Sequence, residues 1–233
     1  MALKQKRTKG VQITDRARAI YKSLPKRPGV VTTQSYLRLE QVLGTQGNIN
    51  FQVLTNEGTP NVNERRLAIS DSFMITSIFI GIYKVGAATP TNAQIAGGVL
   101  NTYPNSITYS KAGEAANLQG IYNGYLSIRV NSVVYIDSLD CFRFYRVSTA
   151  QKGVNVSAAV SNNAYVSEGY EKGDFPFYAL TPGIRLSGAT KNELQVTLPT
   201  SLDLTGTSST NYAVCYLRGF LEQNGAQFNP AGR

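Results

Sequence analysis

The sequence predicts an all-β protein whose body is an antiparallel β-sandwich, preceded by a basic N-terminal segment. Three observations lead to this fold class. Segments with strand-like alternation follow one another from residue 30 onward, turn-forming residues separate them, and no long helical pattern alternates with them. The 233 residues suffice for one sandwich with long loops. A closed antiparallel barrel is the related alternative.

Most of the net charge lies in residues 1–28. This segment holds nine basic residues and one acidic residue, Asp15, so it carries +8, whereas the remaining 14 basic and 13 acidic residues give +1. The basic residues are Lys4, Lys6, Arg7, Lys9, Arg16, Arg18, Lys22, Lys26 and Arg27. We expect them to contact nucleic acid or another polyanion, because dense positive charge attracts phosphates without reading bases. A solvated tail that only aids solubility is the alternative.

Within this segment, residues 14–24 predict a short amphipathic helix. Thr14 can cap its start, and Pro25 and Pro28 end it. The apolar face consists of Ala17, Ile20, Tyr21 and Leu24. A helix this short is marginal alone, so we expect it to pack on the body or on a neighbouring subunit. Residues 1–10 lack apolar periodicity and are expected to be disordered without a partner. The chain therefore divides into an arm, 1–28, and a body, 29–233.

The body reads as a series of strands rich in Val, Ile, Tyr and Phe. They are expected at 35–43, 48–54, 73–85, 120–130, 133–137, 141–147, 183–186, 193–198 and 211–222. Residues 73–85 are apolar on both faces, which favours a central position. Short helices are expected within 91–98 and 111–118. Long polar loops, 86–118 and 148–176, exceed simple connections and suit contacts between subunits.

Cys141 and Cys215 each lie in an apolar, aromatic segment, so we expect two buried thiols rather than a disulfide. The N-terminal charges are not followed by the apolar core of a signal peptide. The best apolar stretch, 73–85, is shorter than the ~18 residues that a membrane helix needs. We therefore expect a protein that is made in the cytoplasm, is not secreted and has no membrane span.

The composition disfavours catalysis. The chain has no histidine, which removes the usual general base, the Ser/His and Cys/His nucleophiles and the commonest zinc ligand. Two carboxylate groupings remain as candidates for acid/base chemistry or calcium binding: Asp137 with Asp140, and Glu168 with Glu171 and Asp174. Solvated turn residues are the favoured interpretation of both. We expect no enzyme, no cofactor and no metal site.

The chain contains 14 tyrosines, which could stack on unpaired bases. Stacking surfaces usually carry Lys or Arg on the same sheet face, yet most predicted strands hold one basic residue or none. We therefore favour tyrosines in the core or at subunit contacts. Arg65 and Arg66 form the only basic pair of the body, and they could bind phosphate or a neighbouring subunit's carboxylate.

The layout of the whole chain resembles that of icosahedral virus coat proteins, including those of bacteriophages. A basic arm (1–9), a basic helical connector (14–24) and a Pro-containing hinge (25–28) precede an all-β body rich in Thr, Ser, Asn and Gly. The resemblance implies a single jelly roll with long loops and a structural virion protein that self-assembles into a shell. Its partners would be copies of itself, packaged nucleic acid and other virion proteins.

Three other functions stay open. A phage head-decoration, spike or tail-associated protein would share the body and use the arm to anchor to other virion proteins. A cellular nucleic-acid-binding β-barrel predicts a basic, aromatic face on the body. A carbohydrate-binding sandwich is disfavoured because the chain lacks tryptophan.

Overall fold

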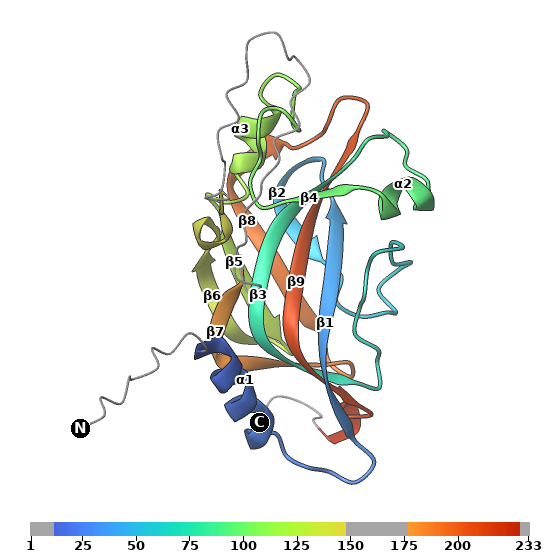
Figure 1. Cartoon of the computed structure of the whole chain (residues 1–233), viewed down its shortest axis with the longest axis vertical. Coiled ribbons are helices and arrows are strands. Elements are labelled where there is room, and N and C mark those ends of the chain that lie inside the picture. Colours follow the sequence, from blue (N-terminus) through green and yellow to red (C-terminus); the bar gives the residue numbers. More distant parts are fainter. Residues whose placement is uncertain (1–11, 148–176, 229–233) are drawn as a thin grey trace, which may run out of the picture.

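In the computed structural model, which describes residues 12–147 and 177–228, two antiparallel β-sheets pack face to face as a sandwich (Figure 1). Sheet A has the strand order β1-β9-β3, with β7 and β4 both paired to the far side of β3. These strands are β1 (Val31–Val42), β9 (Thr210–Gln223), β3 (Ser72–Val85), β7 (Tyr178–Ser187) and β4 (Val99–Asn101). The predicted all-β sandwich is therefore confirmed.

Sheet B has the order β2-β8-β5-β6. Its strands are β2 (Thr45–Phe51), β8 (Asn192–Asp203), β5 (Tyr125–Val130) and β6 (Val133–Asp140). The pairing across the two sheets is nested. β1 pairs with β9, β2 with β8, β3 with β7 and β5 with β6, all antiparallel. The short strand β4 pairs only with residues near the end of β3, from Ile82 to Lys84.

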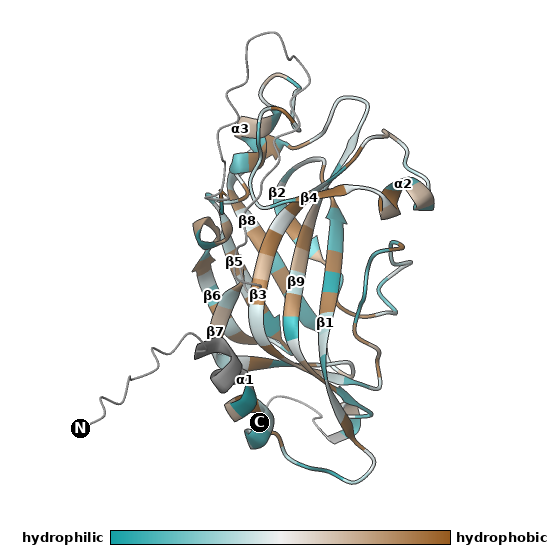
Figure 2. Cartoon of the chain, viewed as in Figure 1, coloured by the Kyte–Doolittle hydropathy of each residue, from teal (hydrophilic) through white to brown (hydrophobic). Residues whose placement is uncertain are grey.

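The core lies between the sheets and consists of the alternate, inward-facing side chains of both. Figure 2 shows this alternation along β1, where polar and apolar residues follow one another. β3 lies between β9 and β7 and is buried along most of its length, as its apolar pattern predicts. On β8, the predicted inward residues Leu194, Val196 and Leu198 are all buried.

One glycine is required where β3 and β9 approach most closely. The register between these strands shifts at Thr76, where β3 bulges opposite Gly219 and Arg218. A Cβ atom at Gly219 would lie only 1.8 Å from the carbonyl oxygen of Met74. A side chain there is incompatible with this strand spacing.

The predicted helix of the basic segment is present as α1 (Gln12–Ser23). It packs on sheet A, because the ring of Tyr21 lies 5.3 Å from that of Phe220 on β9. Leu24, directly after the helix, is buried. Two short helices, α2 (Asn92–Ala96) and α3 (Glu114–Gln119), lie where short helices are predicted.

Three details of the sequence prediction are wrong. Residues 141–147 do not form a strand but begin with the 3₁₀ helix η1 (Cys141–Phe144), because the Asp140 carboxylate accepts a hydrogen bond from the Phe142 N–H, 2.9 Å. β6 runs on through 138–140, which were expected to be a break. β5 begins at Tyr125, since the preceding residues turn tightly at Gly124, where a Cβ would meet the carbonyl oxygen of Thr197.

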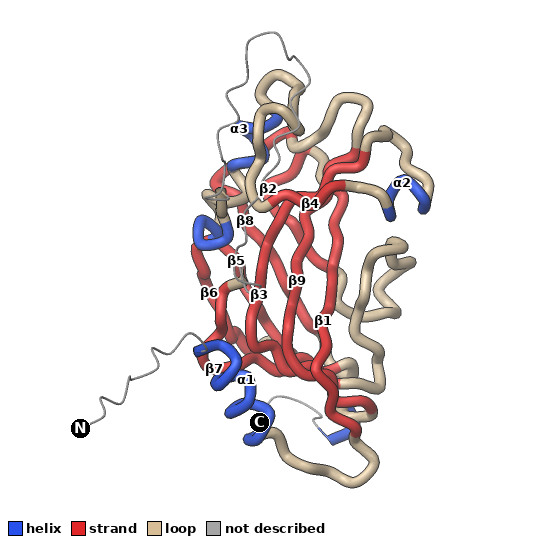
Figure 3. Tube along the Cα trace, viewed as in Figure 1, coloured by secondary structure: helices blue, strands red, loops and turns tan. Residues whose placement is uncertain are grey.

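The connection between β3 and β5, residues 86–124, which contains α2 and α3, lies at one end of the sandwich, and α1 lies at the other (Figure 3). The 3₁₀ helix η2 (Ala226–Phe228) ends the described part of the chain. Both cysteines are free and buried, which confirms the expectation of two thiols. No helix among the described residues is long and apolar enough to cross a bilayer.

Candidate functional site

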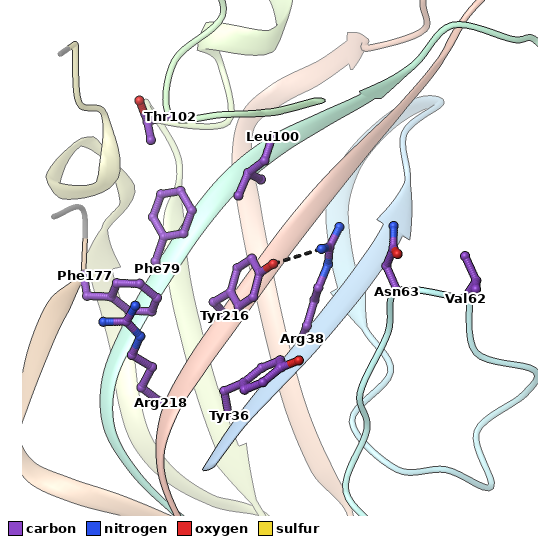
Figure 4. A pocket seen from close by; sticks show the side chains of 10 residues that line it. All are labelled: Tyr36, Arg38, Val62, Asn63, Phe79, Leu100, Thr102, Phe177, Tyr216 and Arg218. Carbon is purple, nitrogen blue, oxygen red and sulfur yellow. Dashed lines mark hydrogen bonds between the residues drawn. The ribbon is translucent and has the colours of Figure 1, made fainter. Parts of the chain in front are cut away.

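The outward face of sheet A carries a pocket of about 670 Å³ (Figure 4). Its walls come from β1, β9, β3, β4, the loop before Glu64 and the residue that precedes β7. The lining residues are Tyr36, Arg38, Val62, Asn63, Phe79, Leu100, Thr102, Phe177, Tyr216 and Arg218. None of these is acidic, and two are arginines.

The centre of the pocket is built from one tripeptide that occurs twice. The sequence Tyr-Leu-Arg stands at 36–38 on β1 and at 216–218 on β9. The antiparallel register places Tyr36 opposite Arg218 and Arg38 opposite Tyr216. Because side chains alternate along a strand, the two leucines enter the core and the four polar-tipped side chains project outward. The result is a checkerboard of two aromatic rings and two guanidinium groups.

Arg38 is held in place by its neighbours. Its Nε donates to the Glu40 carboxylate at 2.7 Å, and its Nη1 donates to the Tyr216 hydroxyl at 2.9 Å. The guanidinium carbon also lies 4.9 Å from the ring centroid of Tyr83 and 5.4 Å from that of Tyr216. Such cation–π contacts and ion pairing fix the plane of the guanidinium group.

Burial sets the protonation of this cluster. The Glu40 side chain is fully enclosed, and burial raises the pKa of its carboxyl, an effect that Arg38 only partly offsets. Burial likewise raises the pKa of the Tyr216 hydroxyl despite the nearby Arg38, so this hydroxyl stays protonated. The one carboxylate bonded to the cluster is thus covered and does not itself line the pocket.

Two further arginines lie on aromatic rings of the same face. The guanidinium carbon of Arg218 lies 3.7 Å from the ring centroid of Phe177, and that of Arg65 lies 5.2 Å from the ring of Tyr36. Phe79, almost completely buried, forms the floor between the rings of Phe177 and Tyr216. Aromatic planes edged by guanidinium groups can bind a flat, anionic ligand by stacking and charge.

The basic pair Arg65–Arg66 does not act as a unit. Arg66 is buried and its Nη2 donates to Glu64 at 2.8 Å, so its guanidinium bonds a carboxylate of its own chain. Glu64 in turn accepts the backbone N–H of Glu40 at 2.8 Å, which joins this loop to β1. Only Arg65 is exposed. Neither role expected for the pair, phosphate binding or a neighbour's carboxylate, applies to Arg66.

The residues predicted to contact polyanions are only partly placed. Lys4, Lys6, Arg7 and Lys9 lie outside the described residues, and Arg16 belongs to α1. Of the remaining four, Arg18, Lys22 and Lys26 are exposed and Arg27 is half-buried. The Tyr21 ring of α1 contacts Phe220, two residues along β9 from Arg218, so the helix adjoins the same outward sheet face as the pocket.

The two carboxylate candidates that the structure describes, Asp137 and Asp140, do not form a metal site. Asp140 caps η1 and Asp137 is exposed on β6. Glu168, Glu171 and Asp174 lie outside the described residues. Within the described ranges, no group of three or more Cys, Asp or Glu side chains is placed to hold a metal ion.

Sequence reasoning missed the pocket because it counted basic residues per strand instead of per sheet face. Most strands indeed carry few, yet Arg38 and Arg218 come from adjacent strands and meet two tyrosines there. The repeated Tyr-Leu-Arg tripeptide was the available signal. It places an aromatic and a basic residue on one face of each strand, whatever the partner strand is.

Comparisons with known proteins find no relatives: the chain matches no protein-family model, no curated protein and no solved structure.

Proposed function

We propose that this protein is a structural virion protein, a coat subunit whose copies assemble into a shell. Its body would be a single jelly roll, and its basic N-terminal segment would contact packaged nucleic acid or neighbouring subunits. The nested strand pairing supports the jelly roll. Setting aside β4, eight strands form two four-stranded antiparallel sheets in which the first strand pairs with the last and the innermost two form a hairpin.

The observation that carries the proposal of self-assembly is an apolar edge on sheet B. β6 is an edge strand, and its first three residues, Val133, Val134 and Tyr135, are each more than two-fifths exposed. Phe142, just beyond the strand, is exposed by 54 %. Edge strands of monomers usually carry charges or proline that prevent pairing with another chain. The acidic residues of β6, Asp137 and Asp140, lie in its second half, and the apolar first half is typical of a surface that another subunit covers.

Electron microscopy of the purified protein at low and high salt, with absorbance at 260 and 280 nm, tests the proposal. We expect closed particles that carry nucleic acid and that lose it or dissociate at high salt, because phosphate contacts weaken as salt rises. A monodisperse monomer without particles would contradict the coat function and favour a decoration or appendage protein.

A pair of variants tests the apolar edge itself. Val134→Glu places a charge on β6 and should abolish or greatly reduce particle formation while leaving the circular dichroism spectrum unchanged. Ile69→Glu is the matched control, since Ile69 is also an exposed aliphatic residue but lies in the turn before β3. Equal assembly by both variants would show that β6 is not a contact.

A further inference from the structure

We infer that the pocket on sheet A binds an unpaired base of a single-stranded nucleic acid, so that the body and not only the basic segment contacts the polymer. The inference rests on the proposed function in one respect, that nucleic acid is the polyanion this chain meets. It adds a chemically different contact, because the pocket would hold the base by stacking, whereas the basic segment would hold phosphates.

The available ring surface supports stacking. Tyr36 is exposed by 44 % on the outward face of the edge strand β1. Phe177 is half-buried, and its ring lies 6.4 Å from that of Tyr216. Tyr36 and Tyr216 lie 6.2 Å apart between ring centroids, at an interplanar angle of 40°. The rings therefore form an open, tilted platform instead of a closed stack. Every base has an apolar face that such a platform accepts, without a requirement for sequence.

The charge around the rings favours an anion. Arg218 lines the pocket and Arg65 lies on Tyr36, whereas the charge of Arg38, which also lines the pocket, is paired with the enclosed Glu40 carboxylate. An arginine over a ring can stack with a base and also donate a hydrogen bond to a phosphate. A neutral sugar offers neither contact. The helix α1, which adjoins this face, carries exposed basic residues. A strand bound by the basic segment could thus continue over the pocket.

The pocket has the size of a single-nucleotide site, and base stacking within a duplex keeps paired bases out of it. Its volume of about 670 Å³ lies within the range of about 300–1,000 Å³ found for small-ligand sites. A base pair inside a helix keeps both faces stacked on its neighbours, so its rings are not available to Tyr36. The site therefore selects single strands.

Binding of the full-length protein to three fluorescein-labelled oligonucleotides tests this selection. They are a 20-mer of dT, an abasic 20-mer with the same phosphates, and a 20-base-pair duplex. We expect the dT strand to bind more tightly than the abasic strand. Tyr36→Ser should reduce the affinity for dT by about 5- to 150-fold, the usual effect of losing one stacking residue, and leave abasic binding unchanged.

Tyr125→Ser is the matched control, because Tyr125 is exposed by 42 % on the outward face of the other sheet. Phe177→Leu is a second pocket variant that keeps an apolar side chain and should lower dT binding in the same direction. No preference for dT over the abasic strand, or equal losses in Tyr36→Ser and Tyr125→Ser, would overturn the inference.

Photo-crosslinking locates the contact directly. An oligonucleotide containing 5-iodouracil should attach to peptides that hold Tyr36, Phe177 or Tyr216, and attachment only within residues 1–28 would overturn the inference. The two proposals fail separately. Particles that show no base preference would support the coat function and contradict base binding in the pocket. Crosslinks to the pocket in a protein that never assembles would support base binding and contradict the coat function.

Discussion

Lys84 and Glu114 form an ion pair inside the end of the sandwich where the connection between β3 and β5 lies. The Lys84 ammonium on β3 lies 3.2 Å from the Glu114 carboxylate at the start of α3, and Glu114 is almost completely buried. The same carboxylate accepts from the Asn211 amide of β9 at 2.8 Å and from the Lys111 N–H at 3.1 Å. One carboxylate thus attaches the 102–124 connection to two strands of sheet A.

Glu114→Ala should lower the free energy of unfolding by up to about 3–5 kcal/mol, because it leaves the partly buried Lys84 without its counter-charge. Chemical denaturation followed by circular dichroism measures this. Glu193→Ala removes a largely exposed ion pair with Lys191, and it should leave stability almost unchanged because solvent screens such pairs. Similar effects of the two variants would show that the 102–124 connection is not held by Glu114.

Gly219→Ala should destabilise the protein by at least about 1–3 kcal/mol, the usual effect of overpacking, since the new methyl group meets the Met74 carbonyl at the bulge. Thermal unfolding of the variant is the measurement. Gly86→Ala is the control, because a Cβ atom there has no neighbour within 4 Å. Wild-type stability for Gly219→Ala would mean that β3 and β9 are further apart than described.

The two cysteines should resist thiol reagents in the folded protein. Burial raises the pKa of the Cys141 thiol to about 12, so at pH 8 only about one molecule in 10,000 carries the reactive thiolate. Burial also raises the pKa of Cys215. We expect no reaction with a chromogenic disulfide at pH 8 and two equivalents in denaturant. Rapid labelling of the native protein would show that the core opens.

Deletion of residues 2–11 should weaken nucleic-acid binding mainly through its salt dependence. The deletion removes Lys4, Lys6, Arg7 and Lys9 and leaves α1 in place. Four phosphate contacts contribute a slope of about −3 to log affinity against log salt for a single strand, so the truncated protein should lose up to that amount. Tyr36→Ser should lower affinity with little change in slope. An unchanged slope in the truncated protein would show that these four basic residues do not contact the nucleic acid.

The sequence predicts the elements of this fold better than it predicts the pocket. β3 is recognisable because Ile, Phe and Met occur on both faces of the strand, and such residues favour burial on both sides. Residues 141–147 look equally strand-like, yet they begin with η1 (Cys141–Phe144), where the Asp140 carboxylate accepts a hydrogen bond from the Phe142 N–H. Alternation identifies which residues share a face of one strand, but the pocket depends on register between β1 and β9, which distant residues set.

The nested pairing has a consequence for how the chain reaches its folded state. Val31 of β1 is the partner of Gln223 of β9, and β9 lies between β1 and β3. Until β9 has been synthesised, β1 and β3 lack the strand that pairs with both of them in sheet A. Native contacts between residues so distant along the chain favour slow folding, and incomplete chains expose unpaired strand edges that are prone to aggregate. Sheet A can therefore form only after the end of the chain has been synthesised, and not when its first strands appear.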